Sequence, residues 1–96
     1  MNDTDHTRPI RNSGTASRMF NGEVVILDRK KNMVMLNPVG SRVWELADGT
    51  HTTEQIAAIL AAEFEVEHKE AENSVTGFIT QLQDKGLLSF LIDVDQ

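Results

Sequence analysis

The sequence contains no cysteine, so neither disulfide bonds nor thiolate chemistry can contribute to the protein. Its apolar runs fall far short of the roughly 20 residues that cross a bilayer. Residues 1–6 are polar and lack the basic start and the apolar stretch of a signal peptide. We therefore expect one cytoplasmic domain of 96 residues that does not associate with membranes.

Motifs for catalysis are also missing. His6, His51 and His68 are far apart, and none has a second ligand at metal-binding spacing. Every glycine stands alone, which excludes a Gly-rich phosphate loop, and no Asp-Ser-Leu attachment site of an acyl carrier occurs. The many carboxylates lie on polar helix faces with no His, Lys or Tyr forced next to them. We expect no enzyme activity, no metal and no cofactor.

Positive charge is scarce in the second part of the chain. Seven bases and four acids precede Val43, whereas two bases and eleven acids follow from there, so the net charge changes from +3 to −9. Proteins that read DNA neutralise phosphates with Lys and Arg, usually on a recognition helix. The acidic half argues against nucleic acid as a partner. A winged-helix DNA-binding regulator is nevertheless kept as the alternative to the function inferred below.

Residue patterning predicts an N-terminal antiparallel sheet. Residues 1–15 are polar and aperiodic and are expected to form a flexible arm, in which residues 8–10 can add an extended segment. Strands are expected where apolar residues cluster, at 18–20, 23–27 and 33–36. Asn21-Gly22 is a strong hairpin signal between the first two. The continuous apolar run at 33–36 indicates a strand covered on both faces.

A corner at Asn37-Pro38 connects the last of these strands to the first helix. Asn is a good N-cap because its side chain accepts a bond from an unpaired helix N–H, and Pro at the first helical position loses no needed donor. The helix is expected over 38–47, before a Gly49 that can adopt the left-handed conformation. Trp44 is expected in the core, with a groove-lining aromatic as the alternative.

Two more helices are expected. Thr52 and Gln55 match a capping box at the start of the second, and the third is expected over 69–85, ending at Gly86. Their apolar faces are Ile56, Ile59, Leu60 and Phe64, then Ala71, Val75, Phe78, Ile79 and Leu82. Residues 87–92 predict a final strand. The fold class is therefore α+β and winged helix-turn-helix-like: a three-stranded antiparallel N-terminal sheet, three helices and a short C-terminal strand.

Two features have more than one interpretation. Gly77 lies in the middle of a predicted helix, where glycine costs about 1 kcal/mol relative to alanine. Either this cost is tolerated, or another backbone approaches the helix closely there. The basic run Arg29-Lys30-Lys31 is most simply a solvated hairpin tip, and alternatively attracts an acidic ligand.

Five segments between residues 16 and 90 together match the pattern of a known family: Val25-Ile26-Leu27-Asp28, the corner from Met35 to Leu46, Asp48-Gly49, Thr53-Glu54-Gln55-Ile56 and Lys85-Gly86-Leu87-Leu88. Through them the sequence resembles the PqqD-like family, named for the peptide chaperone of pyrroloquinoline quinone (PQQ) biosynthesis. The order of the Leu-Asn corner, the Asp-Gly turn and the terminal Lys-Gly-Leu-Leu makes the resemblance more specific than any one segment.

The resemblance implies a peptide-binding domain over 16–92, a recognition element for ribosomally made and modified peptides (a RiPP recognition element). Such a domain binds the leader segment of a precursor and presents it to a modifying enzyme, often a radical S-adenosylmethionine (SAM) protein. In the family the leader adds as a strand beside the third helix. Carried over, the peptide-binding residues are Met33, Val34, Met35 and Leu36 on the strand and Asn73, Gly77 and Gln81 on the helix. An exposed strand edge and a loosely held N-terminal segment also favour a strand-swapped homodimer.

Overall fold

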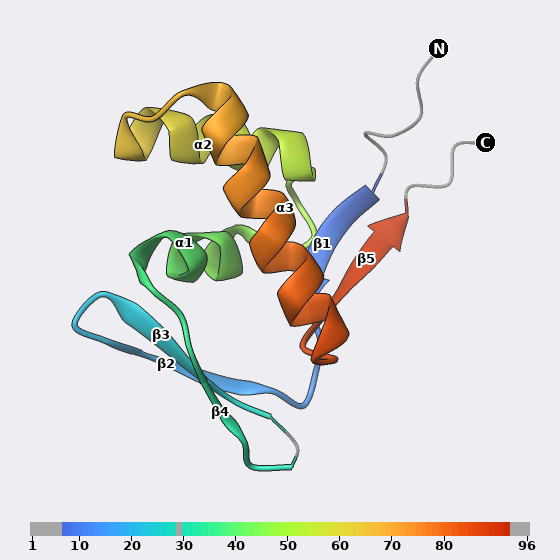
Figure 1. Ribbon diagram of the computed structural model, residues 1–96. Coiled ribbons are helices and arrows are strands. Elements are labelled where there is room, and N and C mark those ends of the chain that lie inside the picture. Colours follow the sequence, from blue (N-terminus) through green and yellow to red (C-terminus); the bar gives the residue numbers. More distant parts are fainter. Residues whose placement is uncertain (1–6, 29, 93–96) are drawn as a thin grey trace.

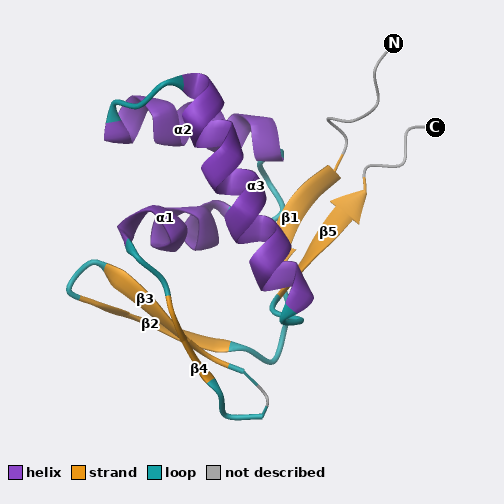
Figure 2. Cartoon of the chain, in the orientation of Figure 1, coloured by secondary structure: helices purple, strands orange, loops and turns teal. Residues whose placement is uncertain are grey.

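The computed structural model describes residues 7–28 and 30–92. Along these residues the elements follow as β1 (Thr7–Arg11), β2 (Ala16–Phe20), β3 (Glu23–Leu27), β4 (Met33–Met35), α1 (Pro38–Leu46), α2 (Thr53–Phe64), α3 (His68–Asp84) and β5 (Leu88–Ile92) (Figure 1). Figure 2 shows the helices grouped together, with the strands in two separate sheets around them. The predicted α+β fold class is confirmed.

The larger sheet is antiparallel, with strand order β2-β3-β4. In β3, Val25 lies opposite Arg18 of β2 on one side and Met35 of β4 on the other. Asn21 and Gly22 form the tight turn between β2 and β3, both with positive φ, as the hairpin signal predicted. This sheet therefore matches the predicted N-terminal meander, and β4 lies at one of its edges.

The prediction of a flexible N-terminal arm is wrong for residues 7–11. They form β1, which pairs antiparallel with β5 so that Pro9 lies opposite Phe90. Pro9 is buried, and the Arg11 N–H donates to the Ala47 carbonyl at 3.0 Å. The sequence allowed an extended segment here, but its partner strand lies at the far end of the chain, and local patterns carry no information about such a pairing. The first six residues of the expected arm lie outside the described part.

The predicted helix starts are confirmed. Asn37 caps α1 by accepting the Gly40 N–H at 2.8 Å. Thr52 and Gln55 form a reciprocal capping box on α2, with distances of 3.1 and 2.9 Å. Glu65 ends α2 in the left-handed conformation, with φ of 56°. Short-range hydrogen bonding thus fixes the ends of the helices much as the sequence indicated.

The core lies between the helices and the inner faces of both sheets. It consists of Val24, Ile26, Leu36, Val43, Trp44, Leu46, Ala47, Ile56, Ala57, Leu60, Ala71, Val75, Ile79, Leu82, Leu87 and Leu88. Trp44 is 3% exposed, and its indole N–H donates to the Ser17 hydroxyl at 3.2 Å. The Arg11 guanidinium lies 5.9 Å from the centre of its ring. Trp44 is therefore a core residue, as predicted, rather than the lining of a groove.

A buried serine connects the sheet to the corner. The Val24 N–H donates to the Ser41 hydroxyl at 2.7 Å, and that hydroxyl donates to the Leu36 carbonyl at 3.1 Å. The Leu36 N–H donates directly to the Val24 carbonyl at 2.9 Å. Residues of a hydrogen-bonded antiparallel pair normally exchange two such bonds. Here one is direct and the other passes through Ser41, which is 2% exposed.

The expectation that residues 33–36 are covered on both faces is wrong. Met33 and Met35 are each 68% exposed, whereas Val34 packs partly against the core and Leu36 is buried. Successive strand residues point to opposite faces, and the described helices cover only one face of this sheet. A continuous apolar run does not reveal that its alternate residues face solvent.

We predict that Ser41→Ala lowers the free energy of unfolding by about 1–3 kcal/mol, because it leaves the buried Val24 N–H without an acceptor. Urea unfolding measures this cost. Ser74→Ala in α3 is the control, since the Ser74 side chain makes no hydrogen bond among the described residues; it should change stability by less than about 0.5 kcal/mol. Equal midpoints for the two variants would show that the relayed bond is unimportant.

Candidate functional site

The edge strand β4 offers main-chain hydrogen-bonding groups on its outer side. One side of β4 pairs with β3, and no other strand among the described residues pairs with the other. Two bonds flanking β4 show which residues face β3: the Leu36 N–H donates to Val24, and the Asp28 N–H donates to Asn32 at 3.1 Å. In an antiparallel pair, residues that face the partner alternate with residues that face away.

This alternation divides the predicted strand residues into two kinds. Val34 and Leu36 direct their main-chain groups toward β3, and Leu36 is fully engaged there through Val24 and Ser41. Met33 and Met35 direct their N–H and C=O groups outward, where no other described residue bonds them. We call these outward groups of Met33 and Met35 the open edge. Of the four strand residues predicted to bind peptide, Val34 and Leu36 do not belong to it.

The three α3 residues predicted to bind peptide are only partly suited to face β4. Asn73, Gly77 and Gln81 are all exposed, and a Cβ atom added at Gly77 would meet nothing within 4 Å. No backbone of the described chain approaches Gly77. The interpretation that another backbone packs closely against the helix at this glycine therefore does not hold within the protein itself. The side chains placed toward the corner and β4 are instead those of Phe78 in α3, which contacts α1, and of Lys85, which directly follows α3.

At Gly40, as at Gly49, an added Cβ atom would come closer than 3.0 Å to another side chain. A Cβ atom at Gly40 would collide with the Phe78 ring, most closely at Cε1. The ring thus packs directly on the first turn of α1 and fixes the distance between α1 and α3. Sequence reasoning missed this role because Gly40 lies in a predicted helix start, where its small size has several explanations.

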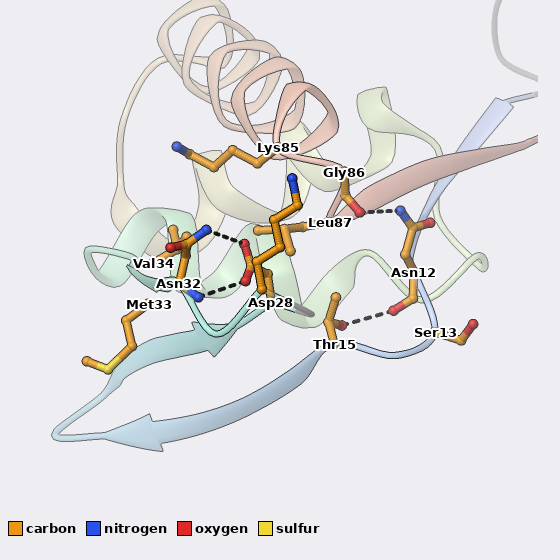
Figure 3. Close-up of a pocket in the computed structure, with 11 residues that line it drawn as sticks. Asn12, Ser13, Thr15, Asp28, Asn32, Met33, Val34, Lys85, Gly86 and Leu87 are labelled. Carbon is orange, nitrogen blue, oxygen red and sulfur yellow. Dashed lines mark hydrogen bonds between the residues drawn. The ribbon is translucent and has the colours of Figure 1, made fainter.

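A hollow of about 710 Å³ opens beside the open edge (Figure 3). It lies between the start of β4, the turn before it, the end of α3 and the link from β1 to β2. Its lining residues are Asn12, Ser13, Thr15, Asp28, Lys30, Asn32, Met33, Val34, Lys85, Gly86 and Leu87. Its lining combines the basic turn with the Lys-Gly-Leu-Leu motif. These segments are far apart in the sequence, so the sequence alone did not predict that they form one hollow.

The walls of this hollow are held by hydrogen bonds (Figure 3). Asp28 accepts the Asn32 N–H at 2.8 Å and its side-chain amide at 3.2 Å. The Asn32 backbone N–H is the main reason that the pKa of Asp28 lies below its usual value. Across the hollow, the Asn12 amide donates to the Gly86 carbonyl at 2.7 Å. Both ends of the hollow are therefore preorganised.

The histidines form no metal centre in the part of the chain that the structure describes. The Nδ1 atom of His51 lies 3.6 Å from Oδ1 of Asp48, and Nδ1 of His68 lies 3.4 Å from Oε2 of Glu72. No group of three or more His, Cys, Asp or Glu side chains gathers among the described residues, and His6 lies outside them. Likewise, no described helix is both long and apolar enough to span a membrane.

The fold and the open edge define a class: a small α+β domain that presents an unpaired strand beside the end of a helix. The chain belongs to the family described as coenzyme PQQ synthesis protein D (PqqD), whose model matches residues 23–88. The resemblance noted in the sequence is thereby confirmed. No curated protein sequence matches the chain.

Solved structures share the fold. TbiB1 in complex with the TbiA(beta) leader peptide is 28% identical, with a TM-score of 0.77 over 88% of this chain and 99% of that one. Lasso peptide synthetase B1 complexed with the leader peptide is 21% identical, with a TM-score of 0.74, covering 88% and 98%. The PqqD part of PqqCD from Methylobacterium extorquens, described as a stand-alone RiPP recognition element, is 24% identical, with a TM-score of 0.72, covering 84% and 87%.

The same substitution at two helical glycines should have opposite effects. Gly40→Ala forces the Phe78 ring to move and should destabilise the protein by about 1–3 kcal/mol. Gly77→Ala enters open space and should stabilise α3 by up to about 1 kcal/mol. Thermal or urea unfolding of the two variants decides this. A Gly40→Ala protein as stable as Gly77→Ala would mean that the contact with Phe78 imposes no constraint.

Proposed function

We propose that the protein is a non-catalytic peptide-binding domain. It binds the leader segment of a ribosomally made precursor by strand addition at the open edge, and presents that precursor to a modifying enzyme such as a radical SAM protein. The observation that carries the proposal is the outward orientation of the Met33 and Met35 main-chain groups next to the hollow at the end of α3. The family and the fold shared with the leader-peptide complex of TbiB1 support it.

Strand addition explains how such a small site can hold a peptide. Met33 and Met35 together offer two donors and two acceptors to a peptide, whatever its sequence. The peptide's alternate side chains would then point toward α3 and give selectivity. Two methionines beside the edge suit this role, since their unbranched, polarizable side chains adapt to different neighbours. None of these steps needs a catalytic group.

The DNA-binding alternative is not supported by the helices. A winged-helix regulator would place its third helix in the major groove, where basic side chains are needed. The exposed residues of α3 include Glu70 and Asp84, and Lys69 is the only Lys or Arg within the helix. Family membership and this charge both favour peptide over nucleic acid.

Homodimer formation through the same edge is an independent proposal. The N-terminal segment that would exchange between chains is paired within this chain as β1 with β5. A strand-swapped dimer would exchange this pairing between two chains, whereas pairing of two open edges would compete with peptide. Light scattering with and without a bound peptide would detect this competition.

Proline scanning of β4 tests strand addition, with peptides selected on the wild-type chain from a random phage-displayed library as the probe. Met33→Pro and Met35→Pro remove only outward N–H groups, so the proteins should fold but bind the selected peptides at least about tenfold more weakly. Val34→Pro removes a ladder bond to β3 and should unfold or strongly destabilise the protein.

Met33→Ala and Met35→Ala are the matched controls, because they shorten the side chain but keep the N–H. Circular dichroism establishes folding, and fluorescence anisotropy of a labelled peptide gives the affinity. If the folded proline variants bind as well as their alanine counterparts, the peptide does not pair with β4.

We also expect no binding to duplex DNA at physiological salt. The acidic surface of α2 and α3 repels phosphates, and the whole chain carries a formal charge of −6. A gel-shift titration with random duplex measures this. Strong retardation that weakens with added salt would restore the regulator hypothesis.

A further inference from the structure

The hollow beside the open edge is lined by two lysines. Lys30 comes from the turn before β4, and Lys85 follows the last residue of α3. Neither ammonium group forms a salt bridge with a described residue. The acid that lines the hollow is Asp28, whose two carboxylate oxygens already accept bonds from Asn32. Asp28 is also attracted by Lys30, so the lining carries two positive charges against one negative charge and keeps an excess of positive charge.

The end of α3 fixes where Lys85 stands. The Lys85 N–H bonds the Gln81 carbonyl at 3.2 Å, and Gly86 then turns the chain with φ of +75°. The next residue, Leu87, enters the core and bonds the Leu82 carbonyl at 2.9 Å. This turn leaves the Lys85 side chain at the rim of the hollow, and Figure 3 shows it projecting from the helix end.

Resting on the proposed function, we infer that the hollow is a subsite for an Asp or Glu side chain of the same peptide, selected by Lys30 and Lys85. The two cations approach from different elements, so a carboxylate between them gains from both. Elsewhere the helical half is acidic, and there a carboxylate of the peptide would be repelled. The basic turn and the Lys-Gly motif, separate in sequence, thereby acquire one shared role.

The direction of the sheet predicts where the acid lies in the peptide. Both described neighbours in this sheet run antiparallel, and antiparallel pairing is the commoner arrangement. A peptide antiparallel to β4 runs from Met35 toward Met33, and its next residues reach the hollow. The selected acid should therefore follow, on the C-terminal side, the stretch that pairs with β4.

Parallel phage-display selections on the full-length chain and its variants test this subsite. The wild-type pool should show alternating apolar residues followed by an enriched Asp or Glu. Lys85→Glu should lose that enrichment, and the double variant Lys30→Glu/Lys85→Glu should replace it with Lys or Arg. Lys69→Glu makes the same charge change at the other end of α3, so it should leave the acid preference intact.

Affinity measurements on one selected peptide give the size of the effect. Replacing its acid by the matching amide should weaken binding to the wild type by about threefold to tenfold at low salt, and less at high salt. The same replacement in the peptide should leave its affinity for the Lys85→Glu variant unchanged.

The outcomes separate the subsite from the peptide site. Wild-type pools with alternating apolar residues but no acid preference would overturn the subsite and leave strand addition standing. An acid preference that survives in the double variant would also overturn it. Pools without any enriched peptide would overturn both.

Discussion

The Ser41 hydroxyl takes the place of a main-chain group between β3 and the residue that follows β4. It accepts from Val24 and donates to Leu36, so it completes the ladder where the chain leaves the sheet to enter α1. Buried main-chain groups are costly when unpaired, and this corner would otherwise leave two of them without partners. The position of α1 on the sheet, and hence of α3 across Gly40, depends on this relay.

The same corner determines how much of β4 remains available. Leu36 is drawn into the core with both main-chain groups engaged, and Asn37 turns at once to cap α1. What remains is a strand of three residues with two outward-facing positions. Short edge strands near lysines resist uncontrolled pairing between chains. The edge is thus restricted in length, which suits the proposed binding of a chosen peptide without promoting aggregation.

Charge is distributed so that the two parts of the protein have different roles. Arg42 bridges α1 to α2 through two bonds to Glu63, at 2.9 and 2.8 Å, which raise the pKa of Arg42 and lower that of Glu63. Both groups are solvent-accessible, so this pair orients the helices more than it stabilises them. Lys30 and Lys85 around the hollow, by contrast, form no salt bridge with a described residue.

The sequence by itself determined the features that depend on neighbouring residues. The hairpin at Asn21, the cap at Asn37 and the capping box at Thr52 all come from hydrogen bonds spanning a few residues, and the burial of Trp44 follows from helical spacing. The family resemblance predicted that the peptide binds at the strand over residues 33–36. These could be predicted because each reports a local conformational preference.

The tertiary structure alone decided what depends on distant segments meeting. It paired Pro9 with Phe90, left Met33 and Met35 exposed while burying Leu36, and placed Phe78 on Gly40. It also brought Lys30 and Lys85 to one hollow. No local pattern records such contacts, because loop closure and packing between elements select them from many arrangements with similar local preferences.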